Sequence, residues 1–385
     1  MMRATAWLRG QIELGRGGPA RLTSMEGLRG LAVSLVFLVH YSRRLGTWAG
    51  DGAHLNGWIL RIADAGNVGV DLFFVLSGYL IYGTLMRHEQ DYRSFIRRRS
   101  RRIFPTFLVV MGAYVLLSLA MPSTSKLPQS VPEMVPYLLF NAMLLPGIVP
   151  VEAFITVAWS LSYEFFFYLT VPIFISRLGL REWTTRRRVR LLVAMGVGFL
   201  LLGGVISGTH PRICMFFGGM VLWEWLTYRW PGRADDAAAV RRVGRLGVLA
   251  LLVGLAAPLV LQSDVLLGLP RIAVVLVAWT VLCASCFAVD GACRRWFSWT
   301  PLRWLGNISY SYYLAHSLVL EAFFLALGLV WSPSGPVGWI WCVLLVPAFL
   351  LTVVGAAVLF ILVEKPLSLD RRSLRELPAA WRQRT

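Results

Sequence analysis

The stretch WCVLLVPAFLLTVVGAAVLFILV, residues Trp341–Val363, predicts a membrane-spanning helix because it has 23 residues and none of them is charged. A helix of about 20 apolar residues crosses the hydrocarbon core of a bilayer. The chain has 385 residues and further long runs that are mostly apolar, such as Val189–Ile206. Only 15% of its residues are charged, against about a quarter in soluble domains. Backbone N–H and C=O groups in lipid must form hydrogen bonds with one another, because no water is present. The spans are therefore expected to be helices. The predicted fold class is therefore all-α, a polytopic membrane helix bundle.

Charge patterning predicts about ten transmembrane helices with both termini in the cytoplasm. The predicted spans lie near residues 26–42, 66–86, 104–121, 159–177, 189–207, 211–228, 244–262, 268–289, 304–330 and 338–363. This arrangement places 31 of the 38 lysines and arginines in inner segments, as the positive-inside rule requires. The apolar stretch Val135–Val149 is interpreted as an outer-face or re-entrant helix, because another span would place the later arginine clusters outside.

The expected organisation is one membrane domain with two basic flanks. Residues 1–25 form a cytoplasmic basic segment, 26–366 the transmembrane domain, and 367–385 a basic tail on the inner membrane surface. The net charge of +18 is explained by this topology, so no nucleic-acid partner is expected. Five cysteines give no disulfide framework, and no metal site is expected.

Ionisable residues within the predicted spans are candidates for function, because each costs a few kcal/mol, roughly, unless it is paired or hydrated. Arg29 and His40 lie eleven residues apart, which puts them on one helix face about 16 Å apart along the axis. Glu26 lies one turn before Arg29 and can pair with it. The alternative is a snorkelling arginine and a histidine satisfied by a neighbouring helix.

Two carboxylates are predicted to lie at the same depth as His40. Asp71 and Glu164 each come a few residues after the outer end of a span, so the three side chains could meet in the outer half of the bundle. A histidine oriented by a carboxylate is the usual arrangement of a general base. The sequence leaves open which carboxylate is the partner.

Arginines also cluster at the cytoplasmic start of the third span, in FIRRRSRRIFP, Phe95–Pro105. Arg99 and Arg102 are three residues apart, so on a helix they point the same way, and paired guanidinium groups suit phosphates. The alternative is a topology signal that also holds lipid headgroups. Ser77 is either a packing residue or a cavity hydroxyl.

A polar helix face is predicted near the end of the chain. The stretch SYSYYLAHS, Ser309–Ser317, contains Tyr310 and His316 among other hydroxyl-bearing residues. A polar cavity wall is the favoured interpretation of this face, ahead of a second catalytic base.

Six stretches, in order along nearly the whole chain, resemble the motifs of acyltransferase family 3, a family of integral-membrane acyltransferases. These stretches are MEGLRGLAVSLVFLVHY (Met25–Tyr41), GVDLFFVLSGYLI (Gly69–Ile81), RRSRRIFP (Arg98–Pro105), WSLSYEFFFY (Trp159–Tyr168), LGNISYSYYLAH (Leu305–His316) and VEKP (Val363–Pro366). Arg29 and His40 match the family's Arg-x10-His signature, Arg99 and Arg102 match its Arg-x-x-Arg element, and Glu164 matches the acid of WSLS-x-E. The family often continues with Glu and Gln, where this chain has Phe165 and Phe166.

The resemblance implies transfer of an acyl group, often acetyl, from cytoplasmic acyl-coenzyme A to a hydroxyl. Acceptors in the family include cell-surface polysaccharides, lipopolysaccharide, peptidoglycan and macrolides, and such an enzyme is a multi-pass protein of the inner or plasma membrane in contact with membrane lipids. The implied acyl-CoA site contains Arg99 and Arg102 at the phosphates, with Arg29 guiding the arm or polarising the thioester.

The implied catalytic set is His40 as general base, with Asp71 or Glu164 orienting it, and Glu26, Ser77, Tyr310 and His316 supporting the site. The rival function is a transporter or flippase of a glycan or lipid intermediate without acyl chemistry. Transporters often show paired repeats with broken helices, and no such repeat is evident in this sequence. A membrane anchor would need no buried charge.

Overall fold

The computed structural model describes residues 10–13, 23–49, 57–122, 125–203, 210–228, 237–261, 268–331 and 338–369. Every regular element within these ranges is a helix, as the apolar runs predict. The elements are α2 (Thr23–Ala49), α3 (Gly57–Gly66), α4 (Val68–Arg87), α5 (Tyr92–Ala120), α6 (Val131–Ala142), α7 (Ala158–Arg177), η2 (Leu180–Glu182), α8 (Thr185–Leu202), η3 (Pro211–Ile213), α9 (Cys214–Tyr228), α10 (Ala237–Val260), α11 (Gly268–Ala288), α12 (Ala292–Phe297), α13 (Thr300–Asn307), α14 (Ser309–Gly328), α15 (Gly338–Leu359) and η4 (Phe360–Leu369).

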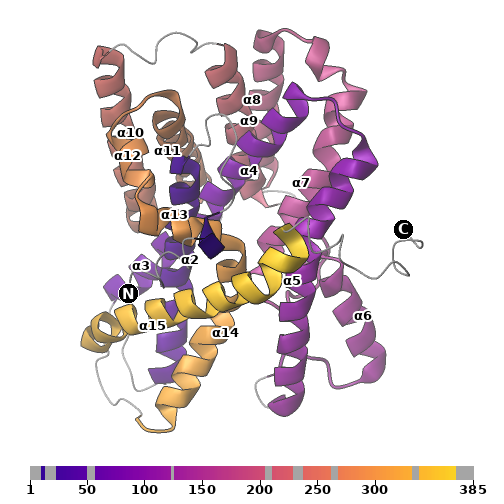
Figure 1. Ribbon diagram of the computed structural model, residues 1–385, viewed down its shortest axis with the longest axis vertical. Helices are drawn as coiled ribbons and strands as arrows, with labels where there is room; N and C mark the ends of the chain where they lie inside the picture. The colour runs from indigo at the N-terminus through magenta and orange to yellow at the C-terminus, as the bar shows by residue number, and fades with distance from the viewer. Residues whose placement is uncertain are drawn as a thin grey trace.

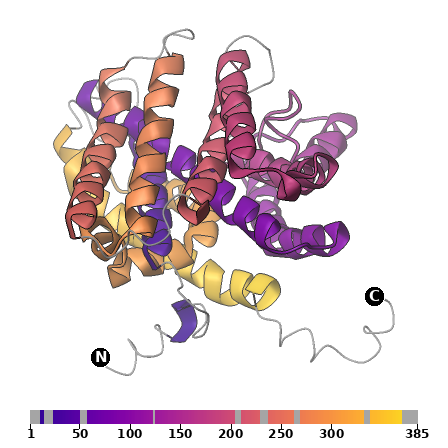
Figure 2. The ribbon, with the colours of Figure 1, turned by 90° about the horizontal axis from the view of Figure 1, so that it is seen from above.

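The first long helix, α2, is the centre of the bundle. It packs against α3, α4, α12, α13 and α14, and its side chains enter both clusters of buried apolar residues. Figures 1 and 2 show α10 and α11 side by side on one side of the molecule and α5 on the other. The rod of α15 continues directly into η4, a π-helix that reaches α5.

Each predicted span overlaps a helix, although the span predicted at 304–330 is divided between α13 and α14, and the count of ten is not confirmed. Among the described residues, seven helical segments are long and apolar enough to cross a membrane. They are Gly57–Arg87, Tyr92–Ala120, Ala158–Arg177, Ala237–Val260, Gly268–Ala288, Ser309–Gly328 and Gly338–Leu369. The other three predicted spans are α2, α8 and α9, which carry charged residues or, for α9, have only 15 residues. The count and the cytoplasmic side of the termini stay predictions.

The apolar stretch Val135–Val149, which was predicted not to cross the membrane, begins within α6 and continues beyond its end. This helix has 12 residues, which is about 18 Å of length and too short for a hydrocarbon core of about 30 Å. The basic tail predicted at 367–385 lies outside the described residues beyond residue 369, as does most of the basic segment 1–25.

The start of α5 is fixed by an N-cap. The Asp91 carboxylate accepts a hydrogen bond of 2.8 Å from the backbone N–H of Ser94. This backbone hydrogen bond lowers the pKa of Asp91 below its ordinary value. The cap sets the register of the arginines that follow on α5.

A buried ion pair joins α8 to α9. Arg188 Nε lies 2.5 Å from Glu224 Oε1, and its second nitrogen donates to Oε2 at 2.9 Å. The hydroxyl of Tyr82 on α4 also donates to this carboxylate at 2.6 Å. Glu224 is fully buried, so these three donors offset the cost of a charge inside the bundle. We therefore assign Glu224 a structural role, which is to hold α4, α8 and α9 together.

Two glycines allow α2 to touch its neighbours backbone to backbone. A Cβ at Gly306 of α13 would lie 1.7 Å from the carbonyl oxygen of Glu26, and one at Gly27 would lie 1.8 Å from that of Phe297. Because the obstacle is backbone oxygen, rotation of a side chain cannot relieve either clash. Close approach through small residues is how membrane helices gain packing energy.

Replacement of Gly306 by alanine should therefore separate α2 from α13. We expect Gly306→Ala to lower the free energy of unfolding by about 1–3 kcal/mol, the usual cost of overpacking. Thermal unfolding of the detergent-purified protein measures the change. Gly112→Ala is the matched control, because a Cβ added at Gly112 would meet no neighbouring atom within 4 Å. Equal stability of the two variants would contradict the packing argument.

Candidate functional site

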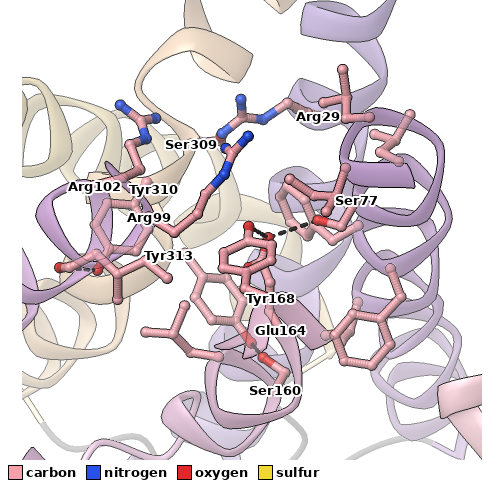
Figure 3. A pocket seen from close by; sticks show the side chains of 18 residues that line it. Arg29, Ser77, Arg99, Arg102, Ser160, Glu164, Tyr168, Ser309, Tyr310 and Tyr313 are labelled. Atoms are coloured by element: carbon pink, nitrogen blue, oxygen red, sulfur yellow. Dashed lines mark hydrogen bonds between the residues drawn. The ribbon is translucent and has the colours of Figure 1, made fainter. Parts of the chain in front are cut away.

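Five helices surround a cavity of about 150 Å³, here called the arginine cavity. It lies between α2, α4, α5, α7 and α14, which are far apart in the sequence. The polar side chains that line it are Arg29, Ser77, Arg99, Arg102, Ser160, Glu164, Tyr168, Ser309, Tyr310 and Tyr313. Figure 3 shows the three arginines gathered on one side and Ser160 on the opposite side.

The structure brings together the three arginines that the sequence singled out. Arg29 comes from α2, while Arg99 and Arg102 come from adjacent turns of α5 and point the same way, as their spacing predicts. The Arg99 guanidinium carbon lies 5.5 Å from the ring centroid of Tyr168. No ion pair joins Arg29 or Arg99 to a carboxylate in the described part of the chain. The cavity therefore keeps an excess of positive charge, which suits an anionic ligand.

Arg102, the third arginine, forms an ion pair with Glu364, a residue for which no role was predicted from the sequence. Glu364 is fully buried in the π-helix, and its Oε1 lies 3.1 Å from the Nη2 of Arg102. Its other oxygen accepts hydrogen bonds from the Ser311 backbone N–H at 3.1 Å and hydroxyl at 2.6 Å. The signal in the sequence was the VEKP motif, in which a carboxylate ends an apolar run. Glu364 positions Arg102 against the cavity.

The acid of the WSLS-x-E motif faces the same cavity. Glu164 accepts a hydrogen bond of 2.7 Å from the Ser77 hydroxyl and another from the hydroxyl of Tyr168. Figure 3 shows this group between the arginines and Ser160. Ser77 is therefore a cavity hydroxyl, one of the two alternatives for that residue. Tyr168 was not identified from the sequence.

Two more tyrosines shape the cavity wall. Tyr310, a predicted supporting residue, donates to the Ile103 carbonyl at 2.7 Å, and the Arg102 guanidinium carbon lies 6.0 Å from its ring centroid. Tyr313, which sequence reasoning missed, shares a hydrogen bond of 2.6 Å with Ser160. The motif around these residues therefore supplies a polar wall, as predicted.

His40 is not among the residues that line the arginine cavity. It contacts His316 of α14, with ring centroids 4.9 Å apart and planes inclined by 73°. His316 is fully buried, and its Nδ1 donates to the Tyr312 carbonyl over 2.9 Å. Tyr313 connects the two places, because it lines the cavity and its ring centroid lies 6.2 Å from that of His316.

The structure does not bring His40, Asp71 and Glu164 together, which differs from the prediction. Asp71 is 2% exposed, and its Oδ1 lies 3.5 Å from the Nε of Arg212. The reason is rotational: six residues separate Asp71 from Ser77 on α4, so they point about 120° apart. Only the Ser77 face meets Glu164.

Glu26 also has a different partner from the predicted one. Its Oε2 accepts a hydrogen bond of 3.0 Å from the Nε of Arg303 on α13. The residue therefore joins α2 to α13 at the place where Gly306 allows close approach, and it does not line the arginine cavity.

Comparison with known proteins gives the family. The family model described as the acyltransferase domain matches residues 22–361. The acyltransferase MdmB of Streptomyces mycarofaciens is 36% identical over 157 residues, which are 40% of this chain and 39% of the relative. The peptidoglycan O-acetyltransferase OatA of Listeria monocytogenes is 26% identical over 76% of this chain and 48% of the relative. The exopolysaccharide production protein ExoZ of Rhizobium meliloti is 28% identical over 66% of this chain and 77% of the relative.

The match to the first two of these relatives covers less than half of their length. No solved structure matches the chain significantly. The family model nevertheless extends from the start of α2 to the π-helix, and so takes in every helix that lines the arginine cavity. The chain belongs to acyltransferase family 3.

Proposed function

We propose that the protein is an O-acyltransferase of the cell's inner or plasma membrane that moves an acyl group from cytoplasmic acyl-coenzyme A to a hydroxyl of a sugar-containing acceptor. The observation that carries the proposal is the convergence of Arg29, Arg99 and Arg102 on one cavity. Coenzyme A carries several phosphates on a long arm, and guanidinium groups bind phosphates through paired hydrogen bonds. The relatives named for peptidoglycan and exopolysaccharide support the proposal of a sugar acceptor.

The donor would lie with its phosphates toward Arg99 and Arg102, at the start of α5. Arg29 would then guide the arm of coenzyme A, so that the thioester lies farther into the cavity, toward Ser160 and Tyr313. The excess positive charge of the cavity supports this assignment, because a partly buried cation is costly unless an anion binds it.

In the reaction, the acceptor oxygen attacks the thioester carbonyl carbon. The new C–O bond forms, the C–S bond breaks, and coenzyme A leaves as a thiolate. His40 takes the proton from the acceptor hydroxyl and returns it to the thiolate, which leaves as the free thiol. His316 would hold the His40 ring in place, since its own ring is fixed by the Tyr312 carbonyl.

Transfer of radiolabel tests the proposal directly. Membranes that contain the protein, supplied with labelled acetyl-coenzyme A and candidate glycan acceptors, should yield an alkali-labile labelled ester on the acceptor. A transporter or flippase would move the glycan without labelling it. Absence of labelled product with every glycan class would contradict the proposal.

Loss of the imidazole should stop the chemistry and spare donor binding. We expect His40→Ala to lower kcat by about 10²–10⁴-fold, the usual contribution of a positioned base. The KM for acetyl-coenzyme A should change little, because His40 does not line the arginine cavity. Steady-state kinetics of the purified protein measures both constants. His88→Ala, an exposed position, is the control, and normal turnover of the His40 variant would remove the base assignment.

Loss of one cavity guanidinium should weaken donor binding. We expect Arg102→Gln to raise the KM for acetyl-coenzyme A by about 10- to 100-fold, the cost of one or two hydrogen bonds to a charged group. Isothermal titration with acetyl-coenzyme A measures the same loss without turnover. Arg101→Gln removes an equal charge from an exposed neighbour and serves as the control. Equal effects of the two changes would show that only overall charge matters.

A further inference from the structure

A second cavity lies behind the first, between α7, α8 and α9. It has a volume of about 200 Å³ and is lined almost entirely by apolar side chains, among them Phe166, Phe167, Met195, Phe216 and Phe217. Phe166 stands at one of the two positions where the sequence departs from the family motif. We call this space the apolar cavity.

Three stacked aromatic rings separate the two cavities. Phe74 lines the arginine cavity, while Phe216 and Phe167 line the apolar cavity. The ring of Phe216 lies between the other two, with its centroid 4.5 Å from that of Phe74 and 4.3 Å from that of Phe167. All three rings are more than nine-tenths buried. The stack is a continuous apolar wall.

The wall stands at the end of the arginine cavity that is remote from the arginines. Ser77 and Glu164 meet in the middle of the cavity, and Phe74 and Ser160 lie one turn earlier on their helices. Figure 3 shows Ser160 on the side opposite Arg29 and Arg99. A donor held by its phosphates at the arginines would therefore direct its acyl group toward this end.

We propose that Phe74, backed by Phe216 and Phe167, limits the length of the acyl group that the protein transfers, so that short acyl groups such as acetyl are selected. The proposal rests on the proposed use of acyl-coenzyme A. A longer chain would have to displace the ring of Phe74 or lie against the polar groups around Glu164. Removal of that ring gives the chain room and, with Phe216 also removed, a path into the apolar cavity.

The test compares coenzyme A thioesters of different chain length. The quantity measured is the ratio of kcat/KM for octanoyl-coenzyme A to that for acetyl-coenzyme A, with one acceptor. Wild-type protein should favour acetyl by about tenfold or more, and Phe74→Ala should raise the octanoyl-to-acetyl ratio by about tenfold, since a few methylenes in an apolar pocket change specificity by this order. Phe74→Ala/Phe216→Ala should raise the ratio further.

Phe217→Ala is the matched control. Phe217 follows Phe216 in the sequence and also lines the apolar cavity. Its ring stacks on Phe199, with the two centroids 5.5 Å apart, and is not part of the wall. Its ratio should equal that of wild type. Where an alanine variant does not fold, Phe74→Leu keeps the site apolar with a smaller side chain and should shift the ratio in the same direction.

Two results would overturn the length limit and leave the proposed donor standing. One is a wild-type protein that uses octanoyl-coenzyme A as well as acetyl-coenzyme A, and the other is an unchanged octanoyl-to-acetyl ratio in the Phe74 variants. A wild-type protein that transfers from no coenzyme A thioester contradicts the proposed donor, and the length limit with it. The activity of wild type with acetyl-coenzyme A therefore separates the two failures.

Discussion

An ionised side chain inside a bundle of apolar helices is tolerated only when another helix supplies its counter-charge. This constraint explains how distant parts of this chain are joined. Each buried carboxylate that is ion-paired has its arginine on a different helical element, and the pairs are Glu26 with Arg303, Asp71 with Arg212, Glu224 with Arg188, and Glu364 with Arg102. The same ion pairs that stabilise the buried charges also fix which helices are neighbours.

In the arginine cavity the positive charges are not all paired with carboxylates. Glu364 neutralises Arg102, and Glu164 is occupied by two hydroxyl donors, while Arg29 and Arg99 have no carboxylate partner among the described residues. A protein that neutralised every charge internally would have no attraction for an anion. The cost of the uncompensated arginines is offset when a phosphate-bearing ligand binds, which is the physical basis of the proposed donor site.

The sequence predicted the helices and the shared direction of Arg99 and Arg102, because apolar runs and helical spacing are local properties. It also predicted that Arg29 joins them, through the family resemblance. It could not predict contacts across the bundle. Helical spacing states which residues share a face but not which helix that face meets, so the pairing of His40 with His316 and of Arg102 with Glu364 was out of reach. These partners are more than 250 residues apart in the chain.

The π-helix at the end of the bundle makes chain length as important as residue identity. In a π-helix each hydrogen-bonded turn contains one residue more than in an α-helix, and π-helical turns often occur at functional sites. Deleting one α15 residue before the π-helix, with the winding of both segments kept, would rotate the Glu364 carboxylate by about 100° about the axis. Arg102 would lose its counter-ion and Ser311 its acceptor with no side chain altered. The number of residues before the π-helix therefore sets the charge balance of the arginine cavity. A residue inserted or deleted there would change that balance, although the cavity is formed by helices that precede the π-helix in the chain.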